Sequence, residues 1–445
     1  MTHENFFESK GWRYARSGKS LDEVHRSIPI PTGMPFWRKC LAFAGPGFLV
    51  AIGYIDPGNW ATDLAGGASY GYLLLSVILF SNIMAIILQH LALKLGIATG
   101  RDLAQACHDH YPKPVSFILW ILAECAIVAT DLAEVIGSAI ALNLLFHIPL
   151  LFAVIITGFD VLLLLALQHK GFRYLEAIII TLLTTIIGCF LIELILANPA
   201  LLPILHGFIP SPELFKNKEI LYLAIGIIGA TVMPHNLFLH SAIIQTRRYE
   251  ETVDGKKEAI QFATWDSTIA LFFAFLVNAA ILIVAASVFY QSGNRGVADI
   301  SNAYQLLTPL LGTTLASLVF GIALLASGQS STITGTLAGQ IVMEGFIHIK
   351  LKPWLRRIIT RGTAIVPAII AISIGGGTSL TQLLILSQVV LSLQLPFAIW
   401  PLVHFTSEKK KMGPFTNSLL LKIIAYVIVF TVIILNGILL LSTFH

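Results

Sequence analysis

Two short motifs place chemically capable side chains beside a proline inside long apolar stretches. The first is Asp56-Pro57-Gly58-Asn59, and the second is Met233-Pro234-His235-Asn236. Together they offer a carboxylate, an amide and a thioether. Mg²⁺ and Ca²⁺ require oxygen ligands, whereas a sulfur ligand favours softer divalent ions. The two motifs therefore predict a mixed oxygen and sulfur site for a partly dehydrated Mn²⁺ or Fe²⁺ ion.

Each proline predicts an interruption of the helix that contains it, because proline cannot donate the backbone hydrogen bond and clashes with the preceding turn. Carbonyl groups before the breaks, such as those of Gly53 and Ala230, then become available as ligands. A charged Asp56 in the bilayer would cost at least ~2.5–3.5 kcal/mol. We therefore expect Asp56 to bind the ion, with N-capping of the second half-helix as the alternative role. For Met233, the alternative to metal binding is simple core packing.

A third set of polar groups lies in the apolar stretch 115–146. Glu124, Asp131 and Glu134 are spaced by seven and three residues, which places them roughly on one helix face. Acids inside a membrane usually face the protein interior and mark proton routes. These acids could form a proton route, or a basic partner such as Arg357 or Arg361 could neutralise them. His235 could relay a proton or only join two helices by a hydrogen bond.

The composition requires an apolar solvent around much of the chain. Of the 445 residues, 56% are hydrophobic and 12% are charged, too few charges to cover a water-soluble protein of this size. With ~20 apolar residues per span, we predict an all-α membrane protein of eleven transmembrane helices. The expected spans are 40–69, 72–95, 115–146, 150–167, 174–196, 220–244, 263–290, 307–343, 358–374, 383–405 and 419–441.

The positions of the basic residues predict the orientation. With a cytoplasmic N-terminus, 25 of the 28 lysines and arginines fall in cytoplasmic segments or at their edges, as the positive-inside rule demands. We therefore expect residues 1–36 to be a cytoplasmic segment, residues 37–445 to be one transporter domain, and the C-terminus to lie outside. Because spans one and six carry the two breaks, spans 1–5 and 6–10 are predicted to form an inverted repeat.

Stretches 51–62 and 233–241 resemble the two signatures of the natural-resistance-associated macrophage protein (Nramp) family of proton-coupled metal transporters. The resemblance extends from about Arg38 to Leu441 and implies a LeuT-like fold. It also implies metal ligands and proton-route residues. The implied ligands are Asp56, Asn59, Met233, Gln388 and the carbonyls of Gly53 and Ala230, and the implied proton-route residues are Asp131, Glu134 and the span-nine Arg361. Members that carry Mg²⁺ or Al³⁺ lack the methionine, so Met233 favours the Mn²⁺/Fe²⁺ branch.

The sequence thus predicts proton-coupled import of divalent transition-metal ions across a bacterial plasma membrane, with Mn²⁺ and Fe²⁺ as the main substrates and Cd²⁺, Co²⁺ and Zn²⁺ as further candidates. An amino-acid-type carrier on the same scaffold is the alternative, but Asp56 would repel a substrate carboxylate. No histidine box predicts an enzyme. We expect no cofactor and no nucleic-acid partner, and a functional monomer in the bilayer.

Overall fold

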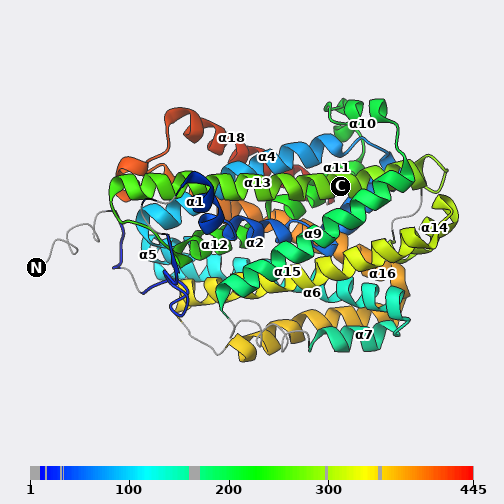
Figure 1. The fold of residues 1–445 in the computed structure, drawn as a ribbon, viewed down its shortest axis with the longest axis horizontal. Helices are drawn as coiled ribbons and strands as arrows, with labels where there is room; N and C mark the ends of the chain where they lie inside the picture. The colour runs from blue at the N-terminus through cyan, green and yellow to red at the C-terminus, as the bar shows by residue number, and fades with distance from the viewer. Residues whose placement is uncertain are drawn as a thin grey trace, which may run out of the picture.

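Long helices lying side by side make up most of the molecule (Figure 1). The structure is a computed structural model that describes residues 11–15, 18–30, 33, 35–159, 171–295, 299–348 and 353–443. Within these ranges, the side chains of residues 215, 353, 354, 356–358, 360, 361, 371, 374–379, 442 and 443 are not described. In the described part, eight helical segments are long and apolar enough to cross a membrane. The chain is therefore an all-helical, multi-pass membrane protein.

The helices follow the apolar stretches of the sequence closely. In the first half they are α1 (Phe36–Phe43), α2 (Pro46–Gly53), α3 (Pro57–Tyr70), α4 (Leu75–Thr99), α5 (Leu103–His110), α6 (Lys113–Phe146), α7 (Leu150–Thr157), α9 (Phe172–Ala197) and α10 (Leu201–Gly207). In the second half they are α11 (Lys218–Val232), α12 (Pro234–Ile243), α13 (Val253–Ala285), α14 (Ile300–Leu311), α15 (Thr314–Ile347), α16 (Pro353–Thr406), α17 (Lys409–Met412) and α18 (Leu419–Thr443).

The predicted interruptions of spans one and six are present. Helices α2 and α3 are separated by Tyr54–Asp56, and α11 and α12 by Met233 alone. Two further interruptions were not predicted. The expected span 40–69 contains Ala44 and Gly45, which separate α1 from α2, and the expected span 307–343 begins inside a separate helix, α14. That helix ends at Gly312, which adopts a left-handed φ of 71° that glycine accepts without strain. The Thr313 hydroxyl then caps α15.

Three further expected spans do not each match one complete helix. The backbone is helical without a break from 353 to 406, so α16 covers both expected spans 358–374 and 383–405. The expected span 150–167 begins as α7, but its residues 160–167 lie outside the described part of the chain.

A pair of two-residue strands lies at the end of the bundle near the N-terminus. Strand β1 (Ile28–Pro29) runs parallel to β2 (Arg247–Arg248). The Ile30 N–H donates to the Arg248 carbonyl and the Arg26 N–H to the Gln245 carbonyl. This pairing attaches residues 11–30 to the segment that follows α12, and we call this end of the bundle the N-terminal face.

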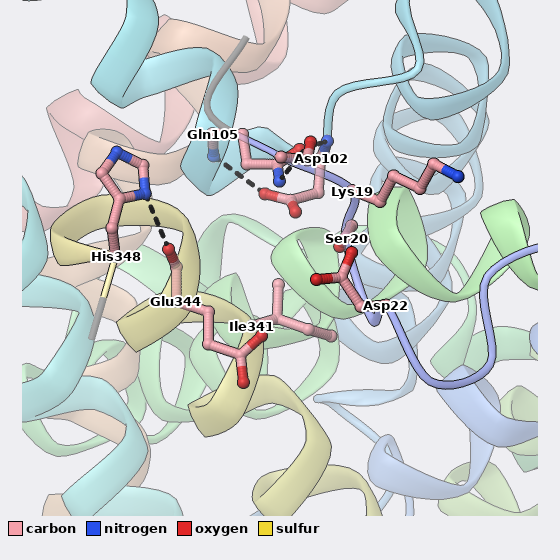
Figure 2. Close-up of a pocket in the computed structure, with 9 residues that line it drawn as sticks. Lys19, Ser20, Asp22, Asp102, Gln105, Ile341, Glu344 and His348 are labelled. Carbon is pink, nitrogen blue, oxygen red and sulfur yellow. Dashed lines mark hydrogen bonds between the residues drawn. The ribbon is translucent and has the colours of Figure 1, made fainter. Parts of the chain in front are cut away.

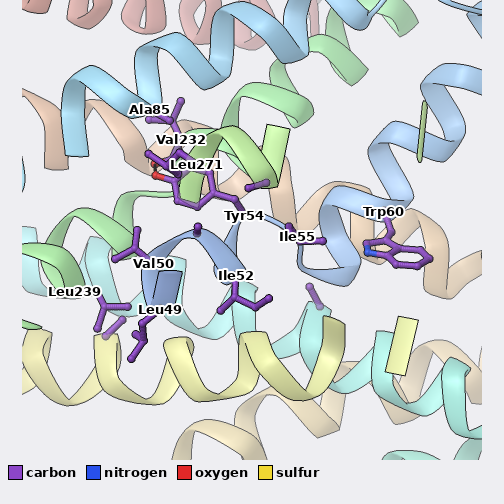
Figure 3. Packing of buried hydrophobic residues seen from close by; sticks show 14 of the residues in the cluster. Leu49, Val50, Ile52, Tyr54, Ile55, Trp60, Ala85, Val232, Leu239 and Leu271 are labelled. Atoms are coloured by element: carbon purple, nitrogen blue, oxygen red, sulfur yellow. Dashed lines mark hydrogen bonds between the residues drawn. The ribbon is translucent and has the colours of Figure 1, made fainter. Parts of the chain in front are cut away.

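The broken helix pair α2–α3 lies in the centre of the apolar core (Figure 3). Tyr54 and Ile55, at the break itself, are fully buried. Trp60 on α3 packs against Phe190, with ring centroids 4.9 Å apart, and against Phe320 at 5.2 Å. Because apolar contacts hold both half-helices, the irregular backbone between them is fixed in position.

Candidate functional site

Asp56 ends the irregular segment between α2 and α3 and caps α3. Its Oδ1 accepts hydrogen bonds from the Asn59 backbone N–H at 2.8 Å and from Asn59 Nδ2 at 3.1 Å. The side chain is fully buried, and its Oδ2 accepts no hydrogen bond of normal geometry from the described residues. The predicted capping role is therefore present, but it uses only one of the two carboxylate oxygens. The other is a buried acceptor with capacity for a ligand.

Met233 is the single residue between α11 and α12. Its φ of 33° and ψ of 103° lie outside the regions that non-glycine residues favour, which costs roughly 1–3 kcal/mol and is typical of functional sites. The side chain is fully buried, and its sulfur accepts a hydrogen bond from Asn236 Nδ2 at 3.4 Å. The strain therefore orients a buried thioether at the helix break.

Direct contacts join the two breaks. Asn59 Nδ2 donates to the Ala230 carbonyl at 3.1 Å, and the Tyr54 hydroxyl donates to the Val232 carbonyl at 3.4 Å. Asn236 packs on Gly53 so closely that a Cβ there would lie 2.6 Å from Asn236 Nδ2. The structure therefore links Asp56, Asn59 and Ala230 directly, and links Gly53 to Met233 through Asn236.

Side chains from two other helices satisfy the carbonyls freed inside the first break. Asn278 on α13 donates to the Tyr54 carbonyl at 2.8 Å, and the Ser327 hydroxyl on α15 donates to the Ile55 carbonyl. The Gly53 carbonyl accepts a longer bond, 3.3 Å, from the Asp56 N–H. These bonds meet the requirement that buried backbone groups be paired.

Gln388 on α16 lies against the first break from a third direction. A Cβ at Gly58 would fall 1.7 Å from Gln388 Nε2, so the amide occupies the space that the missing side chain leaves. Gln388 Nε2 donates to the Ser387 hydroxyl at 3.0 Å, while its buried Oε1 has no partner among the described residues. A glycine at 58 is thus required for the close approach of this predicted ligand.

The predicted proton-route residues are only partly brought together. His235 Nδ1 lies 3.3 Å from the Thr130 hydroxyl of α6, next to Asp131 in sequence. Asp131 and Glu134 are both buried, and Glu134 Oε1 lies against Gly335 of α15. Glu124 is half-buried and accepts a hydrogen bond from Trp120 Nε1 at 3.1 Å. The side chains of Arg357 and Arg361 lie outside the described part.

The chain matches one family over most of its length. The sequence profile of the family described as natural resistance-associated macrophage protein-like matches residues 47–442. The chain belongs to the Nramp family. Family membership makes it a transporter rather than an enzyme.

Close relatives have transport-related names. Two proteins named divalent metal cation transporter MntH, from Listeria welshimeri and Nostoc sp., are each 59% identical to the chain, over 96% and 95% of it and over 95% and 96% of their own lengths. A crystal structure of a manganese transporter from Eremococcus coleocola superposes with a TM-score of 0.88 at 44% identity, covering 96% of the chain and 90% of that protein.

More distant structures share the fold alone. The nucleobase-cation-symport transporter Mhp1 superposes with a TM-score of 0.57 at 14% identity over 81% of the chain and 78% of that protein. For MhsT, the TM-score is 0.56 at 17% identity over 88% of the chain and 98% of that protein. These are LeuT-fold transporters, in agreement with the fold that the resemblance implied.

A series of hydrogen-bonded polar side chains, which the sequence did not reveal, lies next to the second break of this Nramp protein. Gln89 on α4 donates to the Tyr54 hydroxyl at 2.7 Å, and its Oε1 lies 2.9 Å from His240 Nδ1. All three side chains are buried. The available signal was Gln89 itself, an amide in an otherwise apolar span, because such a group needs a partner inside the protein.

The N-terminal face carries a polar pocket under residues 18–22 (Figure 2). It is lined in part by Asp22, Asp102, Glu344 and His348. Asp102 and Gln105 form a capping box at the start of α5, and burial, then His108, lowers the pKa of His348. Among the described residues, no three His, Cys, Asp or Glu side chains are arranged to hold a metal ion, so we assign no metal to this pocket.

Proposed function

We propose that this chain imports divalent transition-metal ions, Mn²⁺ foremost and Fe²⁺ by the same chemistry, together with protons. One observation carries the proposal. Two broken helices bring a carboxylate, an amide, a main-chain carbonyl and, through Asn236, a buried thioether to one place. Mixed oxygen and sulfur donors suit Mn²⁺ and Fe²⁺ better than Mg²⁺ or Ca²⁺. Cd²⁺, Co²⁺ and Zn²⁺ are further candidates for the same donors.

The relatives support the choice of substrate. Proteins 59% identical are named divalent metal cation transporters, and the solved relative at 44% identity is named a manganese transporter. The proposal carries the substrate class over to this chain.

Asn59 sets the first step of binding. Its Nδ2 donates both to Asp56 Oδ1 and to the Ala230 carbonyl, so an amide dipole now bridges two of the proposed ligands. An arriving dication replaces this amide N–H as the partner of both oxygens, and rotation of the amide turns its own oxygen toward the ion. The two oxygens then replace part of the water that the ion loses, so the free-energy cost of dehydrating the ion is smaller.

We further infer eleven spans in an inverted repeat, with the N-terminal face in the cytoplasm, and alternating access around the two breaks. Inward movement of a dication gains ~2.3 kcal/mol per charge per 100 mV. Proton co-transport through Asp131, Glu134 and His235 would add to this drive. The contact of His235 with Thr130 supports the route, because it places the second break beside the acidic helix α6.

The proposal is tested by metal uptake into proteoliposomes under an inside-negative potential. Wild type should take up Mn²⁺ and Asp56→Ala should not, because the ion loses its only anionic ligand. Asp254→Ala, which removes an exposed carboxylate at the start of α13, should transport normally. Uptake by Asp56→Ala near the wild-type rate would reject the assigned site.

The proton arm of the same assay uses a pH-sensitive dye inside the vesicles. Asp131→Asn should reduce Mn²⁺-linked acidification more than it reduces Mn²⁺ uptake. An undiminished ratio of protons to metal would remove Asp131 from the route while leaving the metal site untouched.

A further inference from the structure

A second pocket at the N-terminal face is basic and does not belong to the transport site. It lies where α4 ends, α13 begins and α17 leads into the turn 413–415. Five basic side chains line it: Arg101, Lys256, Lys409, Lys410 and Lys411. Glu251 is the one acidic residue in its lining. Such a concentration of positive charge predicts an anionic ligand.

Neighbouring carboxylates neutralise only part of this charge. Arg101 pairs with Asp109 at 2.7 Å, Lys256 with Glu251 at 2.9 Å, and Lys411 with Glu408. Lys409 and Lys410 are exposed and have no acidic partner among the described residues. Even with Asp109 and Glu408 counted, five basic groups are opposed by three acidic ones, so the pocket keeps an excess of positive charge.

Arg101 gives independent evidence that an anion belongs here. It is 3% exposed, its Nε donates to Asp109 Oδ2, and its guanidinium lies 4.9 Å from the centre of the Trp12 ring. Its buried Nη2 has no hydrogen-bond partner in the described part of the chain. A buried charged donor without a partner is costly. Arg101 lines this pocket, so an oxyanion bound there would stabilise its charge.

The surroundings identify the source of that anion. Met412, Pro414 and Phe415 add apolar surface to the pocket. The outer surface of α18 continues it four residues later with Leu419 and Leu420, which are 75% and 69% exposed. The N-terminus of the long helix α13 also lies at the pocket and favours negative charge. A phosphate group joined to acyl chains matches this neighbourhood of cations and apolar surface.

We propose that this basic pocket binds the phosphate of an anionic phospholipid from the membrane leaflet at the N-terminal face. The phosphodiester contacts Lys409 and Lys410 near the Arg101 guanidinium, while the acyl chains lie along α18. Free inorganic phosphate offers the same oxyanion without the apolar part, so the test must separate these two sources.

Native mass spectrometry of the full chain in detergent, titrated with phosphatidylglycerol or phosphatidylcholine, measures the binding. We expect one saturable phosphatidylglycerol adduct and weaker retention of phosphatidylcholine. Lys409→Gln/Lys410→Gln should bind phosphatidylglycerol ~30-fold more weakly, since each basic residue near a membrane surface contributes a factor of ~5 and the two factors multiply. Both lysines are exposed and lack ion pairs in the described part, so the variant keeps the fold.

Lys113→Gln/Lys257→Gln is the matched control, because it removes the same charge from exposed positions of the same side of the bundle outside the pocket. It should bind phosphatidylglycerol like wild type. Equal loss in both variants would show general electrostatic attraction and overturn the site. In the second arm, lipid-free protein is dialysed to equilibrium against radiolabelled inorganic phosphate. It should show no saturable phosphate binding. Saturable phosphate binding without a phosphatidylglycerol preference would overturn the lipid assignment.

Discussion

At the scale of single residues, Met233 combines backbone strain with an unusual donor atom. Its positive φ occurs at the one residue that separates α11 from α12. Leucine or isoleucine would fill the same core space. Packing therefore does not require methionine at this position, whereas a thioether acting as the proposed ligand would favour Mn²⁺ over Ca²⁺ and Mg²⁺.

Replacing Met233 by alanine should preserve Mn²⁺ transport and reduce the preference for Mn²⁺ over Ca²⁺ by ~10-fold, equivalent to ~1.4 kcal/mol. Competition between Mn²⁺ and Ca²⁺ during proteoliposome uptake measures this ratio. Met343→Ala, a truncation of a buried methionine on α15, is the control and should keep the preference. Unaltered selectivity in Met233→Ala would show that the sulfur is no ligand.

A second prediction tests whether Gln388 acts at the first break. Gly58→Ala places a methyl group where the Gln388 amide now lies, so the amide must move away. The variant should weaken apparent Mn²⁺ affinity to the same extent as Gln388→Ala, and the double variant should show no further loss, because the two changes remove one interaction. The concentration dependence of initial uptake measures this affinity.

Gly188→Ala controls for the helix position, since a Cβ at residue 188 meets no atom within 4 Å. If the losses of apparent Mn²⁺ affinity add in the double variant, Gly58→Ala acts through the backbone of α3 and not through Gln388.

Residue types and spacing predicted the two helix breaks of the candidate site, but not the contacts between them. The prolines at 57 and 234 made both breaks predictable, because proline chemistry is local. The contact of Asn59 with Ala230, 171 residues away, follows from tertiary packing, and so does the role of Asn236 between Gly53 and Met233. The resemblance to a family supplied the ligand names, whereas spacing alone could not have placed Gln388.

At the scale of elements, several buried contacts constrain the joint between α1 and α2. Gly45 has a φ of 137°, and a Cβ there would lie 2.4 Å from the Glu176 carboxyl carbon. Glu176 is held by Arg247, which also donates to the Ala44 carbonyl at 2.8 Å. Asp266 accepts from the N–H groups of Gly45 and Gly47. Residues from α9, β2 and α13 thus fix the start of the first broken helix.

Gly45→Ala should therefore destabilise the protein by at least ~1–3 kcal/mol, because alanine rarely adopts this positive φ and the Glu176 carboxylate would have to move. A fluorescence-detected thermal unfolding assay in detergent should show a Tm lower by at least ~2 °C. Gly437→Ala on α18, where a Cβ meets nothing within 4 Å, should leave the Tm unchanged or raise it slightly. A Tm for Gly45→Ala equal to wild type would show that the joint is not fixed as described.

Helix positions were predicted more accurately than helix connections. The apolar run 72–95 gave α4 to within a few residues, because a span is set by the thickness of the bilayer. The separate helix α14 was missed because its apolar residues were counted as part of the next span. It is amphipathic, with Ile300, Ala303 and Leu307 buried, and its apolar residues add to the count of the span that follows.

At the scale of the whole molecule, residues 11–30 tie together the ends of several helices at the N-terminal face. The N–H groups of Arg13 and Tyr14 donate to the Asp109 carbonyl at the end of α5. Strand β1 pairs with β2 after α12. Trp12 lies against Phe405, at the end of α16, with ring centroids 5.5 Å apart. Alternating access, as proposed, requires these helix ends to separate, so this segment must detach from some of them during transport.

Trp12 contributes several of the contacts that attach this segment. Its ring also lies 5.2 Å from the Lys411 ammonium group and 4.9 Å from the Arg101 guanidinium, and partly buried cation–π contacts contribute up to ~2 kcal/mol each. Trp12→Ala should therefore raise amide hydrogen exchange in peptides covering 101–111 and 245–249 by ~10-fold. Tyr14→Ala removes a more exposed ring of the same segment and should change exchange much less. Faster exchange in Trp12→Ala with unchanged exchange in α18 would show local release of the N-terminal face. Uniformly faster exchange would mean global destabilisation, and no change would mean that the segment does not hold this face closed.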